Sequence, residues 1–120
     1  MAFTRANLQQ FYGSETFYRN PLFGKYRYTE GVKYIGDNGA SWLVTDILAF
    51  QGEPDIQAYA KQEHFQAWTL TVNDDESATL VCEDGNNRVI FAHDYTYVDF
   101  PLSRIKLYLC NTVLLLPSEY

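Results

Sequence analysis

The chain has 120 residues, 47% of them hydrophobic and 20% charged, a globular balance that excludes a disordered chain. Fifteen acidic and nine basic residues give a net charge of −6, which argues against a domain that binds nucleic acid or anionic membranes through charge. The start has no apolar stretch of the secretory kind, and the longest apolar run is 113–116, so we expect one cytoplasmic domain over residues 1–120, with no membrane contact and with free thiols at Cys82 and Cys110.

The N-terminal part predicts a helix followed by irregular chain. Thr4 can cap the helix, Leu8, Phe11 and Tyr12 recur at helical spacing, and Gly13 follows as a stop. Residues 14–24 read as irregular, and 25–28 alternate between basic residues and tyrosine, as in a short strand. Residues 32–35 fit either a strand or a helical turn, and the glycine-rich stretch 36–39 breaks them.

Two further helices are expected before the pattern changes to that of strands. Residues 41–50 place Leu43, Val44, Ile47 and Leu48 on one face. A second helix is expected from Pro54, which suits a first helical position, to about Gln62.

Alternation with a period of two predicts strands from residue 65 onward. Residues 65–93 read as a three-stranded antiparallel meander, whose second turn carries the hairpin signal Asp84-Gly85. Further strands are expected at 95–98, 105–109 and 112–116. Helices first and strands second favour an α+β fold, with N-terminal helices packed on a C-terminal antiparallel sheet of about five to six strands.

Six stretches together resemble an uncharacterised family of small bacterial proteins that carries only a domain-of-unknown-function label. They are 11–15 (FYGSE), 28–34 (YTEGVKY), 41–43 (SWL), 65–72 (FQAWTLTV), 77–85 (SATLVCEDG) and 116–120 (LPSEY). The resemblance runs from end to end of the chain. It implies an origin in bacteria, among cyanobacteria or mobile elements, and it transfers no activity to any residue.

The candidate catalytic residues are His64 and His93, because each has an acidic neighbour in sequence and histidine titrates near neutral pH. The competing interpretation of His64 is a favourable charge at the end of a helix. Neither pairing amounts to a positioned constellation, so we lean against an enzyme.

No metal or cofactor is expected. The two histidines and two cysteines lack zinc-site spacing, and the acidic turns at 74–76 and 83–87 lack the calcium-loop pattern. Phosphate-loop, dinucleotide and hydrolase-elbow motifs do not occur in the sequence.

Charge and aromatic residues are unevenly distributed. The first 35 residues carry five basic and two acidic side chains together with nine of the 20 aromatic residues, whereas the remainder has a balance of −9. We therefore expect an interaction or regulatory domain that binds a protein partner, or a second copy as a homodimer, through an N-terminal surface containing Phe17, Tyr18, Arg19 and Phe23. The alternatives are a small enzyme using His64 or His93 with a nearby carboxylate, and a protein that binds or mimics nucleic acid.

Overall fold

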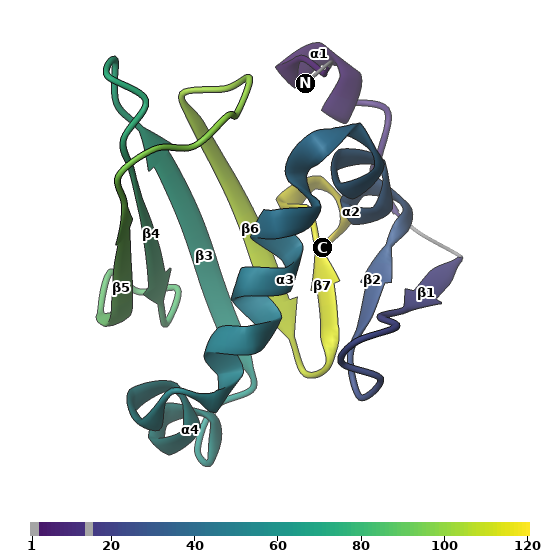
Figure 1. The fold of residues 1–120 in the computed structure, drawn as a ribbon. Helices are drawn as coiled ribbons and strands as arrows, with labels where there is room; N and C mark the ends of the chain where they lie inside the picture. Colours follow the sequence, from purple (N-terminus) through teal and green to yellow (C-terminus); the bar gives the residue numbers. More distant parts are fainter. Residues whose placement is uncertain (1–2, 14–15) are drawn as a thin grey trace.

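The structure is a computed structural model that describes residues 3–13 and 16–120. Its centre is one sheet of seven strands in the order β1-β2-β7-β6-β3-β4-β5 (Figure 1). The strands are β1 (Phe17–Arg19), β2 (Arg27–Thr29), β3 (Phe65–Val72), β4 (Ala78–Glu83), β5 (Val89–Tyr95), β6 (Arg104–Cys110) and β7 (Val113–Leu115). Neighbours are antiparallel except for β2 and β7, which run parallel.

The α+β class and the meander β3-β4-β5 are confirmed, but the expectation of a purely antiparallel sheet of five to six strands was wrong. The difference comes from β1 and β2, which add two three-residue strands to the sheet. Part of the segment predicted to be irregular is therefore β1, while residues 14 and 15 lie outside the described residues. The strands β2 and β7 are far apart in sequence, and Arg27 pairs with Val113. Such a tertiary contact cannot be predicted from the local sequence pattern.

Two loops between strands differ in how well they were predicted. The Asp84-Gly85 hairpin is confirmed: the Asp84 amide donates to the Arg88 carbonyl (3.0 Å), and Gly85 has φ +93. The strand expected at 95–98 is wrong, because β5 ends at Tyr95 and the chain then leaves the sheet. The Val98 amide instead donates to the carbonyl of Glu76 (2.8 Å), in the turn between β3 and β4.

Threonine side chains cap the first two helices. Thr4 caps α1 (Arg5–Leu8) as predicted, but this helix is a single turn and does not extend to Tyr12. The ambiguous segment 32–35 is helical, within α2 (Glu30–Ile35), which Thr29 caps. A kink at Gly36–Ala40 leads into α3 (Ser41–Ala49), and α4 (Pro54–Ala60) follows.

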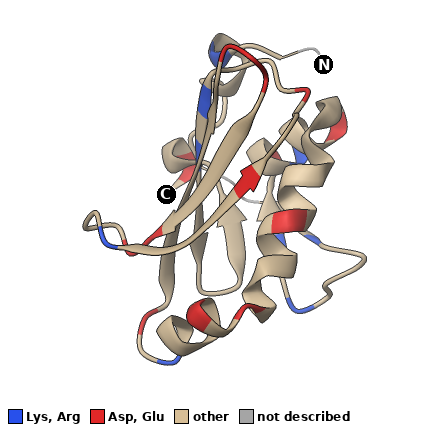
Figure 2. Ribbon diagram, turned by 60° about the vertical axis from the view of Figure 1, so that its left-hand side comes forward, with Lys and Arg blue, Asp and Glu red and all other residues tan. Residues whose placement is uncertain are grey.

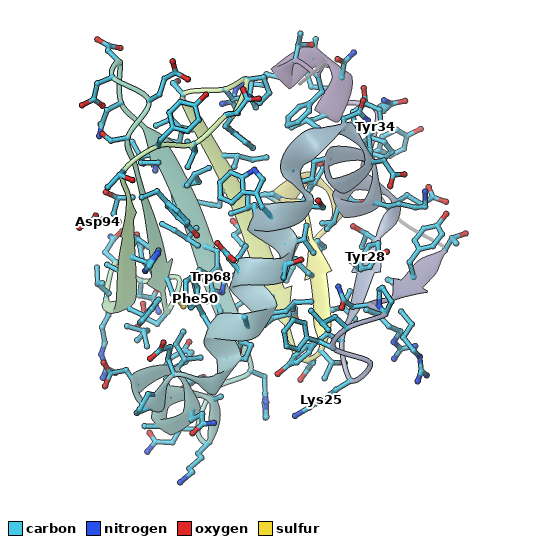
Figure 3. The ribbon with its side chains drawn as sticks, viewed as in Figure 1. Lys25, Tyr28, Tyr34, Phe50, Trp68 and Asp94 are labelled. Carbon is cyan, nitrogen blue, oxygen red and sulfur yellow. The ribbon has the colours of Figure 1, made fainter. Side chains whose placement is uncertain are left out.

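Helices α2 and α3 cover one face of the sheet, and the core lies between the two layers (Figure 1). Leu43, Ile47 and Leu48 of α3 are almost fully buried, as are Leu70 and Leu107 of the sheet. Phe50, just after α3, stacks on Trp68 of β3 with ring centroids 6.2 Å apart, and Figure 3 shows the two side by side. Each such buried side chain contributes about 1.5–3 kcal/mol.

The end of the chain is tied to the start of α2. The carboxylate of Glu119, in the short helical turn Pro117–Glu119, accepts hydrogen bonds from the Thr29 hydroxyl (2.6 Å), the Gly31 amide (3.1 Å) and the Leu116 amide (3.0 Å). We call this arrangement the Glu119 clamp. It joins segments almost 90 residues apart and fixes the path of the C-terminal residues.

Candidate functional site

The face of the sheet opposite α2 and α3 is the candidate functional site, and we call it the open face. Burial alternates along β4 and β6, since residues directed toward the helices are buried and the intervening ones are more exposed. The strand register assigns alternate residues of all seven strands to the open face. Its centre is covered by neighbouring side chains, because Ala67 and Thr69 of β3 and Leu115 of β7 are buried.

Basic side chains gather on one half of the open face. Arg19 of β1 lies opposite Arg27 of β2, and both are exposed. Arg104 and Lys106 are on the same face of β6, alternating with the buried Ile105 and Leu107. The period-two pattern of β6 could have revealed these two residues from the sequence, but they were missed.

Acidic side chains occupy the other half of the open face. Glu83 lies on β4 and the exposed Asp94 on β5, where Asp94 accepts a hydrogen bond from the Thr79 hydroxyl (2.9 Å). Figure 3 shows Asp94 on this outer strand, apart from α3. Figure 2 shows red segments on β5 and in the loops at the ends of the neighbouring strands, as well as on the helices. The charge of the open face thus changes from positive to negative across the strands.

Apolar and aromatic groups lie between and beside these charges. Phe65, Tyr108 and Tyr120 form one cluster, with ring centroids 4.9–5.6 Å apart and ring planes inclined at 58–83°. Val113 and Leu115 of β7 and Val81 of β4 are also on this face. Such a mixture of aromatic, aliphatic and arginine side chains is typical of protein–protein contacts.

The structure separates the four residues predicted as a binding surface. Phe17 (48% exposed) and Arg19 lie on the open face, whereas Tyr18 points to the helix side and stacks on Tyr28 with centroids 5.8 Å apart. Phe23 is half-buried against the core. Phe17 and Arg19 thus belong to the candidate site, and Tyr18 and Phe23 lie elsewhere.

The two candidate catalytic histidines lie in different places. His64 is exposed after α4, and its carbonyl accepts a hydrogen bond from the Asn111 amide (2.7 Å). His93 lies on the helix side of β5 against Phe50 and Tyr95, at centroid distances of 5.0 and 4.7 Å. The carboxylate in this neighbourhood belongs to Asp46, which accepts a hydrogen bond from the Tyr95 hydroxyl (2.6 Å).

The thiols and metal-ligating side chains of the described residues form no cluster. Cys82 and Cys110 are free, and burial raises the pKa of the Cys82 thiol to about 12, so this thiol stays protonated near neutral pH. Within residues 3–13 and 16–120, no three His, Cys, Asp or Glu side chains lie together as a metal site would need. No helix in the described part of the chain is long and apolar enough to cross a membrane.

Comparison with known proteins identifies a family and nothing further. A family model described as "Family of unknown function (DUF6876)" matches residues 2–120. No curated protein and no solved structure matches the chain.

Proposed function

The chain belongs to this family of unknown function, and we propose from the geometry of its sheet that it is a protein-interaction domain that pairs with a second copy of itself through the open face. The observation that carries the proposal is the division of charge on that face: Arg19 and Arg27 on one half, Glu83 and Asp94 on the other. A surface that carries both signs in separate halves is complementary to its own copy.

Two-fold symmetry can bring the oppositely charged parts of two open faces together. In a symmetric dimer the same patch is contributed by both copies. When two open faces meet about an axis parallel to the strands, the order of strands is reversed across the interface while height along the strands is kept. Arg27 on β2 of each copy then lies over β4 of the other, near the height of Glu83, and this favourable contact occurs twice, whereas Arg104 and Lys106 of the central strand β6 lie near the axis.

The size of the face is that of a small specific contact. Seven strands about 4.8 Å apart span about 29 Å, but β1, β2 and β7 are three residues long, whereas β3 to β6 have six to eight. The strands together project to an area of about 600 Å², somewhat below the roughly 800 Å² that each partner contributes to a typical specific interface. Two sheets packed face to face with their strands nearly aligned are also a common packing mode in proteins.

The aromatic cluster favours a protein partner over single-stranded nucleic acid. Bases stack on ring faces that are free and accessible. On the open face, Phe65, Tyr108 and Tyr120 are inclined against one another, so each ring covers part of its neighbours. This edge-to-face arrangement leaves an irregular apolar surface, which suits side chains better than stacked bases.

The test is the molecular mass in solution, measured by light scattering and sedimentation over a range of concentrations. The wild type is expected to form a dimer that weakens as salt is raised. Arg27→Glu and Glu83→Lys should each shift the protein toward monomer, and the combined variant should recover the dimer, because the swap restores opposite charges. Lys25→Glu is the matched control, because this substitution changes the charge by the same amount as Arg27→Glu. Lys25 lies against Tyr26, outside the strands.

Two results would contradict the proposal. One is a wild type that remains monomeric at all concentrations, and the other is an equal effect of Lys25→Glu and Arg27→Glu. A gel-shift assay with single-stranded oligonucleotides is run in parallel. Oligonucleotide binding by a monomeric wild type that is lost in Arg27→Glu would assign the open face to nucleic acid instead.

A further inference from the structure

A small pocket on the helix side of the sheet has the features of a cation-binding site. It has a volume of about 290 Å³ and lies where the start of α3 meets the chain that follows β5. The lining residues are Gly39, Trp42, Tyr95, Tyr97, Val98 and Asp99. Three of the six are aromatic, one is acidic and none is basic. We call it the aromatic pocket.

Two of its walls are held in place by contacts outside the pocket. The rings of Trp42 and Tyr95 are 5.4 Å apart and inclined at 72°, as two adjacent walls of a box would be. Trp42 also packs edge-on against Phe100, at 6.3 Å. The Tyr95 hydroxyl donates to the carboxylate of Asp46 (2.6 Å), which fixes the direction of its ring. Such prior ordering lowers the entropy cost of binding.

The backbone beside the pocket has an unusual conformation. Gly39 has φ +105 within the kink that separates α2 from α3. This region of backbone space is rarely adopted by residues with a side chain, and glycine adopts it freely. Both Gly39 in this kink and Trp42 just after it line the pocket.

The electrostatic surroundings of the pocket are negative. Asp99 is one of its lining residues, and Asp46 accepts the hydrogen bond from the Tyr95 hydroxyl, while His93 packs edge-on against the Tyr95 ring at 4.7 Å. The charges of Glu76 and, next, Asp99 raise the pKa of Tyr97, which is 64% exposed at the rim. Ring faces and carboxylates around one space attract the same kind of ligand, namely a positive charge.

We propose that the aromatic pocket binds an N-methylated ammonium head group. Its volume is at the lower limit of ligand pockets and accommodates one head group. Ring faces offer few hydrogen-bond acceptors, so a cation with N–H groups would give up hydrogen bonds to water on entering the pocket without replacing them. A cation whose N–H groups are replaced by methyl groups has the smallest desolvation cost. This site is separate from the open face and does not depend on the proposed dimer.

Tryptophan fluorescence provides a direct test on the intact protein. The two tryptophans differ in environment: Trp68 is 1% exposed in the core, and Trp42 is a wall of the pocket. Choline and tetramethylammonium should change the emission with a saturable dependence on concentration, relative to the same concentration of sodium chloride. The uncharged isostere of choline, 3,3-dimethylbutan-1-ol, should not. In Trp42→Phe the response should disappear.

Matched variants separate the pocket from the rest of the surface. Tyr97→Leu keeps an apolar side chain but removes the ring, and the choline dissociation constant should rise about 3- to 30-fold. Asp99→Asn should also weaken the binding of choline. Tyr12→Leu is the control, because Tyr12 is 81% exposed and outside the pocket, and it should leave the affinity unchanged.

A further comparison distinguishes two sources of the head group. A capped trimethyllysine that binds more tightly than choline would identify a modified protein side chain, and the reverse order would identify a free small molecule. Equal responses to choline and its uncharged isostere would overturn the proposal, because the pocket would then recognise shape alone. The absence of any saturable response to choline up to about 10 mM would overturn it as well. The binding free energy would then be weaker than about −2.7 kcal/mol.

Discussion

Substitution of Gly31 tests whether the Glu119 clamp holds the C-terminal residues on the fold. A Cβ atom added at Gly31 would lie 2.6 Å from Glu119 Oε1 and 2.6 Å from Leu116 Cδ1, closer than non-bonded atoms can approach. The carboxylate cannot move aside freely, because it accepts three hydrogen bonds. Leu116 is buried at 3% exposure, so its side chain is also confined.

The expected size of the effect follows from two opposing contributions. Alanine in place of glycine within a helix gains up to about 1 kcal/mol. Displacing the carboxylate weakens hydrogen bonds to a charged group, and because Glu119 is half-buried we expect a loss of about 2–4 kcal/mol for the set. Gly31→Ala should therefore lower the free energy of unfolding by about 1–3 kcal/mol, and the melting temperature by about 4–12 °C.

Gly36→Ala is the matched control for this prediction. Gly36 follows the same helix at φ −62, and a Cβ added there meets nothing within 4 Å. This variant should be as stable as the wild type or more stable by up to about 1 kcal/mol. Urea unfolding followed by tryptophan fluorescence measures both. In a Glu119→Ala background, Gly31→Ala should cost less, because the oxygen that it displaces is absent. A Gly31→Ala protein as stable as Gly36→Ala would refute the reasoning.

Two other predictions concern buried titratable groups. Burial raises the pKa of the Cys82 thiol to about 12, so on alkaline titration the unfolded state loses this proton first. Stability should therefore fall between about pH 9 and 12, by up to about 1.4 kcal/mol per pH unit from this group, and urea titrations should show a shallower decline for Cys82→Ala. Tyr95→Phe removes the hydroxyl that donates to Asp46 and should cost about 1–2 kcal/mol in urea unfolding. Burial, and next the hydrogen bond to Asp46, also raises the pKa of Tyr95. Tyr95→Phe should therefore lose less stability than the wild type as pH rises above 10. The same dependence of stability on pH in both proteins would contradict this prediction.

The sequence predicted the structure best where the local conformation depends on residues close together in the chain. The hairpin at Asp84-Gly85, the meander around it and the helix begun by Pro54 follow from turn chemistry and periodicity, and the structure has all three. The alternation at 25–28 predicted a short strand that β2 (Arg27–Thr29) overlaps, whereas the three residues of β1 are too few for a period to be distinguished. Their place in the sheet depends on β7, which follows about 85 residues later.

The candidate site was predictable only in part, for the same reason. Phe17 and Arg19 were selected from the concentration of rings and cations near the N-terminus, and both lie on the open face. Alternation separates Tyr18 from them, since neighbouring strand residues point to opposite faces. The aromatic pocket had no sequence signal, because Trp42, Tyr95 and Tyr97 come from different elements and meet only in the folded chain.

The central claim, that the open face is the contact between two copies, is tested most directly by intermolecular nuclear Overhauser effects. Isotopically labelled and unlabelled chains are mixed, unfolded and refolded together, and only contacts between labelled and unlabelled copies are recorded. The account predicts that the methyl groups of Val81 and Val113 on one copy contact protons of the open face on the other. Contacts that arise instead from the exposed surfaces of α3 and α4, or no intermolecular contact in a sample of dimer mass from any open-face methyl group, would contradict it.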